Sequence, residues 1–209
     1  MITNYQNFKN LNEDNRYNNI IDFTCLNKDC DRNMVEKTCK TAQEMGVYSI
    51  CILPEFVSDA KIFLEDTPVK VCAVIDFPEG ESKSTQKLKD TREVIIAGVD
   101  EVDLVMNYKK LKNATVNQME EVYDDLVNEV REIARECHKN GIVLKVIIES
   151  GELTLDQVKT ACQICVDGGA DYVKTSTGKT IRGAELNKVQ FMRKILPDHV
   201  RIKAAGGIR

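Results

Sequence analysis

Three lysines lie within short apolar runs that have the composition of buried β-strands. They are Lys145 in VLKVIIES (143–150), Lys174 in DYVKTST (171–177) and Lys203 in RIKAAGG (201–207). A lysine inside a barrel of strands sheds much of its hydration, which disfavours the ammonium form and lowers its pKa. The neutral amine can attack a carbonyl carbon and form a Schiff base. The sequence therefore predicts amine chemistry, although spacing alone does not rank the three lysines.

The pairing of two of these lysines strengthens the prediction. Lys203 lies on the strand that follows the strand of Lys174, and neighbouring strands run about 4.8 Å apart. Two lysines that point inward would repel each other and lower each other's pKa. The alternative is that one of them points outward and extends its charged end past the covering helices to water.

A carboxylate lies in another apolar run. Asp103 occurs within VDLVM (102–106), and a buried carboxylate almost always has a partner. That partner is expected to be a cation inside the barrel, and the role of the pair is either structural or catalytic. A carboxylate beside an amine and a water can move the protons that imine formation and enamine protonation require.

Two turns rich in small residues follow the strands of Lys174 and Lys203. TSTGK (175–179) and AAGGIR (204–209) expose backbone N–H groups, which are suited to hold a phosphate. Glycine is also common in turns that bind nothing. The candidate binding residues in these turns are Thr175, Ser176, Gly178, Lys179, Gly206 and Gly207, and Arg209 would add positive charge.

The elements that must position these residues alternate along the chain. Apolar runs rich in Val and Ile indicate parallel strands covered on both faces. They are expected at 20–24, 47–54, 70–78, 101–108, 143–150, 171–177 and 201–207. Helical patterns lie between them at 33–45, 55–64, 83–97, 115–139, 154–167 and 184–195, with glycines 46, 98, 141 and 168 where helices should stop.

This alternation predicts an α/β fold with a parallel sheet, either doubly wound or a (β/α)₈ barrel. No GxGxxG motif follows the first strand, which argues against a dinucleotide-binding doubly wound fold. The polar strand residues gather toward the carboxyl ends of the runs, where barrel active sites lie. We therefore expect residues 1–209 to form a single (β/α) barrel domain, incomplete at its C-terminus, with the eighth strand and last helices missing.

Composition favours a metabolic enzyme over other classes of protein. The 209 residues carry a net charge of -4, and no basic face predicts binding to nucleic acid or to a membrane. The polar first residues lack the apolar core of a signal peptide, which predicts a cytoplasmic protein. The eight cysteines are then expected to be reduced core residues, including the CQIC pair at Cys162 and Cys165.

Four segments together resemble one enzyme family. VLKVIIESGELT, GADYVKTSTGK, GVDEVDLVMNY and KAAGGIR are similar to deoxyribose-phosphate aldolase, a class I aldolase on a (β/α)₈ barrel. The similarity runs in order from about Ile21 to Arg209, and VKTSTGK is its most specific segment.

The resemblance implies reversible cleavage of 2-deoxy-D-ribose 5-phosphate to D-glyceraldehyde 3-phosphate and acetaldehyde, without a metal or an organic cofactor. It implies that Lys174 forms the Schiff base, that Lys203 lowers its pKa, and that Asp103 belongs to the proton relay, which sets Lys145 aside as nucleophile. Lys179, Gly206 and Gly207 match residues around the phosphate, and Cys51 matches a pocket position.

Two departures keep alternatives open, together with the missing eighth strand. Asp76 stands where many members have glycine or asparagine, and its charge could repel a phosphate. Phe23 stands where many members have histidine or leucine. The alternatives are a related Schiff-base aldolase with a different sugar phosphate, and a non-catalytic barrel fragment that binds a sugar phosphate or another subunit. Homodimers are common in the family, so a homodimer is a further expectation.

Overall fold

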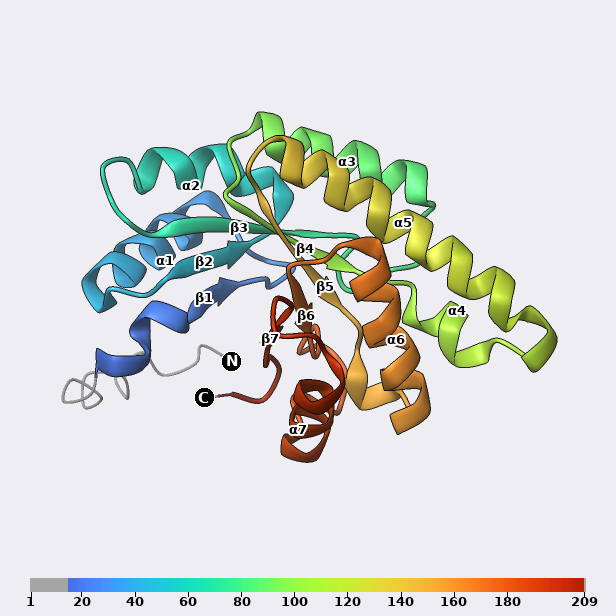
Figure 1. The fold of residues 1–209 in the computed structure, drawn as a ribbon. Coiled ribbons are helices and arrows are strands. Elements are labelled where there is room, and N and C mark those ends of the chain that lie inside the picture. The colour runs from blue at the N-terminus through green and yellow to red at the C-terminus, as the bar shows by residue number, and fades with distance from the viewer. Residues whose placement is uncertain (1–14, 209) are drawn as a thin grey trace. The chain divides into compact units, whose positions relative to one another are not determined.

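The computed structural model describes residues 15–208 of the chain (Figure 1). Contacts divide the chain into two compact units, Met1–Cys72 and Ala73–Arg209, and strand β3 (Lys70–Ile75) crosses the boundary between them. No helix among the described residues has the length and apolar character needed to cross a membrane. The predictions drawn from the first residues and from Arg209 fall outside the described part.

The first unit places two parallel strands beside two helices. Its elements are η2 (Asn15–Ile20), β1 (Asp22–Cys25), α1 (Arg32–Met45), β2 (Ser49–Ile52), η3 (Pro54–Phe56) and α2 (Val57–Phe63). Helix α1 begins after Asp31, whose side chain accepts a hydrogen bond from the Met34 N–H at 2.8 Å. It ends at Gly46, which has φ +63°, a left-handed conformation that glycine adopts readily.

The second unit holds four further strands, β4 (Glu101–Val105), β5 (Val143–Ile147), β6 (Tyr172–Lys174) and β7 (Arg201–Lys203). Each pairs with the next in parallel, in sequence order. The helices of this unit are α3 (Ser84–Ile96), α4 (Tyr108–Asn113), α5 (Met119–Lys139), α6 (Leu155–Gly168) and α7 (Leu186–Ile195), with short 3₁₀ turns η4 (Val116–Gln118) and η5 (Ser150–Glu152).

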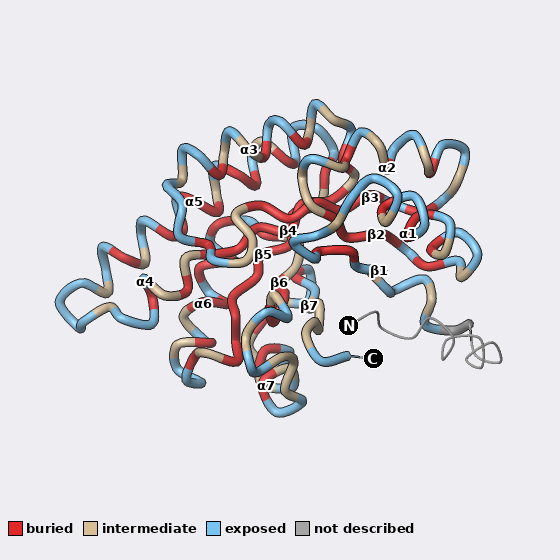
Figure 2. Tube along the Cα trace, turned by 180° about the vertical axis from the view of Figure 1, so that it is seen from behind, coloured by how far each residue is buried: buried red, intermediate tan, exposed pale blue. Residues whose placement is uncertain are grey.

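The core of the second unit lies between these strands and helices. Every residue of β4 is buried, and so is β5 after Val143, so both strands are red in Figure 2. Helix α5 packs along both α3 and α6 (Figure 1). Its buried residues recur with helical spacing along one face, as in Leu126, Val130 and Ile133. A rigid strand layer therefore supports the side chains that the strands carry.

Every strand predicted from an apolar run is present, but all except β1 end earlier than their runs do. The run at 101–108, for example, is a strand only to Val105, and the short helix α4 that follows was not predicted. Helix α6 begins with a capping box, in which the side chains of Thr154 and Gln157 each bond the other residue's backbone N–H. Helix α6 ends at Gly168, as predicted, and the next residue, Gly169, takes the left-handed conformation, with φ +83°.

All eight cysteines are free thiols, and Cys162 and Cys165 are buried within α6. Burial raises the pKa of Cys162 to about 12, so its reactive thiolate form is scarce near neutral pH. The prediction that residues 1–209 form a single domain stays a prediction.

Candidate active site

Strand register places the chemically active residues of the second unit on one side of its sheet. Asp103 of β4 is paired with Lys145 of β5, and two residues further along β5 Ile147 is paired with Lys174 of β6. Side chains of register partners point to the same side, and so do residues two apart in a strand. The register alone therefore predicts that Asp103, Lys145 and Lys174 lie on one side.

The side chains on this side form a buried chain of alternating charges. Asp103 bonds both lysines: Oδ1 accepts from Lys145 Nζ at 2.8 Å, and Oδ2 accepts a short hydrogen bond from Lys174 Nζ. Lys145 Nζ also lies 2.6 Å from Glu101 Oε2. All four residues are buried. Two carboxylates and two ammonium groups thus balance their charges away from water, which a buried cluster requires.

The environment of Asp103 keeps it ionised. Burial by itself raises the pKa of this carboxyl group, but the ammonium groups of Lys145 and Lys174 outweigh burial and hold the pKa well below its ordinary value. Asp103 is therefore a carboxylate at neutral pH. It can accept a proton or stabilise a cation on Lys174.

Lys203 lies where the sequence placed it, on the strand next to Lys174. The two lysines are direct register partners of β6 and β7, and the Thr175 N–H donates to the Lys203 carbonyl at 2.9 Å. Their side chains therefore leave neighbouring strands on the same side of the sheet. Lys203 is half-buried, whereas Lys174 is 6% exposed.

The two glycine-containing turns after β6 and β7 pack directly against each other. A Cβ atom on Gly183 would lie 2.1 Å from the Gly206 carbonyl oxygen, and one on Gly206 would lie 3.3 Å from the Gly178 Cα atom. The Ala184 N–H donates to the Gly206 carbonyl at 3.0 Å. Only residues without a side chain permit this approach. The turns of Gly178 and Gly206, which were predicted to bind phosphate, therefore form one continuous backbone surface.

Residues within these turns differ in exposure. Thr175 is buried, and its hydroxyl bonds both the Ala205 carbonyl and the Ala205 N–H at 3.0 Å. Ser176 is also buried, but its hydroxyl has no hydrogen-bond partner among the described residues. Lys179 and Gly207 are exposed. Thr175 thus joins the two turns, whereas the hydroxyl of Ser176 is buried without a partner.

Glu149 is a supporting residue that the sequence did not assign. It lies two residues past the end of β5, is fully buried, and has φ +49°, a strained conformation for glutamate. Its carboxylate accepts hydrogen bonds from the Thr177 N–H at 3.1 Å, the Thr177 hydroxyl at 2.7 Å and the Thr180 hydroxyl at 2.9 Å. Glu149 therefore fixes the turn that contains Lys179. The available signal was its position at the end of a buried strand.

One predicted site residue lies in the first unit. Cys51 is fully buried in β2, and its assignment to the substrate pocket stays a prediction.

Comparisons with known proteins identify the relatives of the chain. Residues 18–209 match the model of the DeoC/LacD family of aldolases. A deoxyribose-phosphate aldolase from Mycoplasmoides gallisepticum is 38% identical over 92% of this chain and 82% of its own length. One from Caldicellulosiruptor saccharolyticus is 41% identical over 90% of this chain and 83% of its own.

Solved structures agree with the sequence relatives. A structure described as QR15, an aldolase, has a TM-score of 0.82 and 35% identity, over 90% of this chain and 80% of that one. The deoxyribose phosphate aldolase of Aeropyrum pernix has a TM-score of 0.79 and 27% identity, over 90% of this chain and 76% of that one. The predicted (β/α)₈ barrel class is thereby confirmed. The chain belongs to the DeoC/LacD family of aldolases.

Proposed function

We propose that this aldolase cleaves 2-deoxy-D-ribose 5-phosphate reversibly to D-glyceraldehyde 3-phosphate and acetaldehyde, through a Schiff base on Lys174. The observation that carries the proposal is the buried contact between Lys174 and the carboxylate of Asp103. The names of the relatives supply the substrate, and the joined glycine turns supply a surface suited to its phosphate.

The reaction begins at the aldehyde carbon of the open-chain sugar. After Lys174 gives up a proton, its nitrogen attacks C1, and loss of water leaves an iminium ion. The iminium withdraws electrons from the C2–C3 bond. Removal of the proton from the C3 hydroxyl then releases D-glyceraldehyde 3-phosphate and leaves the enamine of acetaldehyde. Protonation of the enamine at C2 and hydrolysis of the imine regenerate Lys174.

Asp103 suits two roles in this sequence. Its carboxylate lies beside the Lys174 nitrogen, so it can accept the proton that nitrogen loses, directly or through a water. The same negative charge then stabilises the iminium cation. Lys203, on the neighbouring strand, adds a positive charge that favours the neutral amine form of Lys174.

Lys145 is a positioning residue in this scheme. Its ammonium is held between Glu101 and Asp103 at 2.6 and 2.8 Å, so it orients one oxygen of Asp103 and leaves the other to Lys174. A lysine whose charge two carboxylates balance is a poor nucleophile. This geometry supports Lys174 over Lys145 as the amine that reacts.

The phosphate end of the substrate has its candidate site in the turns after β6 and β7. Gly178, Gly206 and Gly207 supply exposed or half-buried backbone, and Lys179 supplies an exposed ammonium. The Ser176 hydroxyl is buried and has no partner among residues 15–208. It is suited to donate a hydrogen bond to the sugar or to accept one from it.

The location and the assembly of the protein are further proposals. A cytoplasmic location fits the metabolic substrate. A homodimer remains the expected assembly, although the structure of the Aeropyrum pernix relative is described as tetrameric.

A turnover assay tests the proposal. The purified protein is given deoxyribose 5-phosphate, and release of D-glyceraldehyde 3-phosphate is followed with a coupled dehydrogenase. We expect turnover by the wild type and none by Lys174→Met. Lys145→Met should still form the imine on Lys174, which borohydride trapping measures. Turnover of another sugar phosphate, with none of deoxyribose 5-phosphate, would favour a different aldolase of the family. Binding of sugar phosphates with no turnover would favour the non-catalytic alternative.

A further inference from the structure

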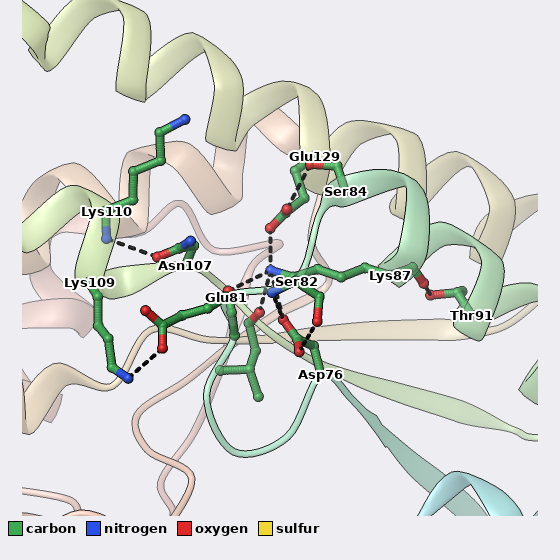
Figure 3. A network of polar contacts seen from close by, with 12 residues as sticks. Asp76, Glu81, Ser82, Ser84, Lys87, Thr91, Asn107, Lys109, Lys110 and Glu129 are labelled. Carbon is green, nitrogen blue, oxygen red and sulfur yellow. Dashed lines mark hydrogen bonds and ion pairs between the residues drawn. The ribbon is translucent and has the colours of Figure 1, made fainter.

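A buried lysine outside the candidate active site anchors the loop between β3 and α3. Lys87 of α3 is fully buried, and its ammonium donates to the Gly80 carbonyl at 2.9 Å, the Val105 carbonyl at 3.0 Å and Glu129 Oε1 at 2.8 Å (Figure 3). Three donors thus meet three acceptors, on the loop, on the end of β4 and on α5. A buried charge held in this way resists displacement, because any movement leaves a polar group unpaired.

The loop itself, residues 76–82, is folded tightly onto this anchor. Asp76 has φ +55°, and its carboxylate accepts from the Ser82 N–H at 2.8 Å and the Ser82 hydroxyl at 2.7 Å. The Gly80 N–H closes the turn on the Asp76 carbonyl at 2.9 Å. A Cβ atom on Gly80 would lie 2.6 Å from the Met106 carbonyl oxygen. The anchor and the close approach at Gly80 therefore both constrain the conformation of the loop.

The three acidic residues of the loop each have a cation of the same unit close by. Lys87 Nζ lies 3.5 Å from Asp76 Oδ2. Lys109 Nζ lies 2.5 Å from Glu79 Oε2 and 2.8 Å from Glu81 Oε2, and Figure 3 shows Lys109 directed at Glu81. Two lysines serve these three carboxylates, and Lys87 also pairs with Glu129. The negative charge of the loop, including the Asp76 charge that the sequence suggested would repel a phosphate, is therefore only partly balanced.

The remaining large side chain of the loop faces the candidate phosphate site. Lys179 Nζ lies over the Phe77 ring, 6.0 Å from the ring centroid. Among residues 15–208 the Lys179 ammonium has no ion pair. An aromatic ring attracts an ammonium without cancelling its charge, whereas a carboxylate in the same place would cancel it. The ring can thus hold Lys179 in place and leave its charge for an anion.

We propose that Phe77 is a specificity-determining residue that orients the Lys179 ammonium toward the substrate phosphate, and that Lys87 is the positioning residue that holds the Phe77 loop. The proposal rests on the proposed function in one respect: it takes Lys179 as a ligand of the substrate phosphate. It adds to that function a reason why phosphorylated sugars are preferred over unphosphorylated ones.

A double-mutant cycle tests the contact between Phe77 and Lys179. Phe77→Leu, Lys179→Met and the double variant are titrated with inorganic phosphate, and turnover of deoxyribose 5-phosphate and of 2-deoxyribose is compared. We expect Phe77→Leu to weaken phosphate binding about two- to five-fold, the factor expected of one exposed cation–π contact, and to reduce the preference for the phosphorylated sugar. In the Lys179→Met background, Phe77→Leu should have no further effect.

Lys87→Met tests the anchor, and Arg92→Met is its matched control. Arg92 joins the same two helices as Lys87, through Glu136 at 2.9 Å, but this pair is partly exposed and does not involve the loop. If the variant folds, Lys87→Met should weaken phosphate binding. Adding Phe77→Leu to Lys87→Met should then weaken phosphate binding no further. Arg92→Met should do neither. If Lys87→Met does not fold, the Phe77 cycle alone decides the proposal.

The outcomes separate this proposal from the proposed function. If the wild type binds phosphate but does not cleave deoxyribose 5-phosphate, the proposed function is wrong. The Phe77 proposal is still supported in that case if Phe77→Leu weakens phosphate binding only when Lys179 is present. Cleavage by the wild type, with phosphate binding unchanged in Phe77→Leu, overturns the Phe77 proposal alone. An equal loss of activity toward both sugars in Phe77→Leu overturns it as well.

Discussion

Replacement of Asp103 by asparagine removes one negative charge from the buried cluster of Glu101, Asp103, Lys145 and Lys174. The side-chain volume stays nearly the same. The wild-type cluster balances two ammonium groups with two carboxylates. In Asp103→Asn, Lys145 keeps its contact with Glu101, and Lys174 loses its contact with a carboxylate. Removal of one partner from a buried ion pair costs about 3–5 kcal/mol. We expect the free energy of unfolding at pH 7 to fall by about that amount.

The pH dependence of this loss has a definite sign. The folded pKa of Asp103 lies below its unfolded value of 3.8. Its contribution to stability is therefore complete above that value and declines as pH falls toward the folded pKa. At pH 3 most unfolded chains already carry the proton, so this group contributes about 1 kcal/mol less than at pH 7. The difference in stability between wild type and Asp103→Asn should shrink by that amount.

Urea unfolding at pH 7 and pH 3, followed by circular dichroism, measures both quantities. Asp125→Asn is the control, because it makes the same chemical change in the surface pair of Asp125 and Lys110, whose side chains are 54% and 41% exposed. Such a pair contributes at most about 1 kcal/mol. The reasoning is refuted if Asp103→Asn is as stable as Asp125→Asn at pH 7, or if its deficit is as large at pH 3 as at pH 7.

Two further substitutions test the turns around the candidate phosphate site. Gly183→Ala places a methyl group against the Gly206 carbonyl, so the turns must separate. We expect the free energy of unfolding to fall by about 1–3 kcal/mol and the KM for deoxyribose 5-phosphate to rise. An unchanged KM would show that the joined turns do not bind the phosphate. Glu149→Gln replaces one acceptor oxygen of a carboxylate that accepts three hydrogen bonds. We expect this change to cost about 1–3 kcal/mol and to raise KM more than it lowers kcat, measured by steady-state kinetics; a fall in kcat alone would contradict a role in holding the turn of Thr177.

The strands and the lysines they carry were predictable from the sequence because composition and register determine them. Runs of Val and Ile that lack polar alternation occur in buried parallel strands, and all seven runs contain a strand. Helix α4 was missed because NYKKLKN has only two residues, Tyr108 and Leu111, that become buried. So short a segment shows no helical period.

The anchoring residues were not predictable for a different reason. Lys87 is one of several charged residues on α3, and helical spacing places it on the same face as the buried Thr91 and Val94. Its partner Glu129 is likewise one of many acidic residues on α5. A sequence does not show which of these charges find each other across two helices. Lys145 was recognised as a candidate amine. Its ion pairs with Glu101 and Asp103 could not be predicted without knowing the register between β4 and β5.

Imine trapping tests the central claim most directly. The protein is incubated with deoxyribose 5-phosphate, sodium borohydride reduces any imine to a stable amine, and peptide mapping by mass spectrometry locates the adduct. Our account predicts an adduct on Lys174, and none there in Lys174→Met. An adduct confined to Lys145 or Lys203, or no adduct in folded protein that turns the sugar over, would contradict it.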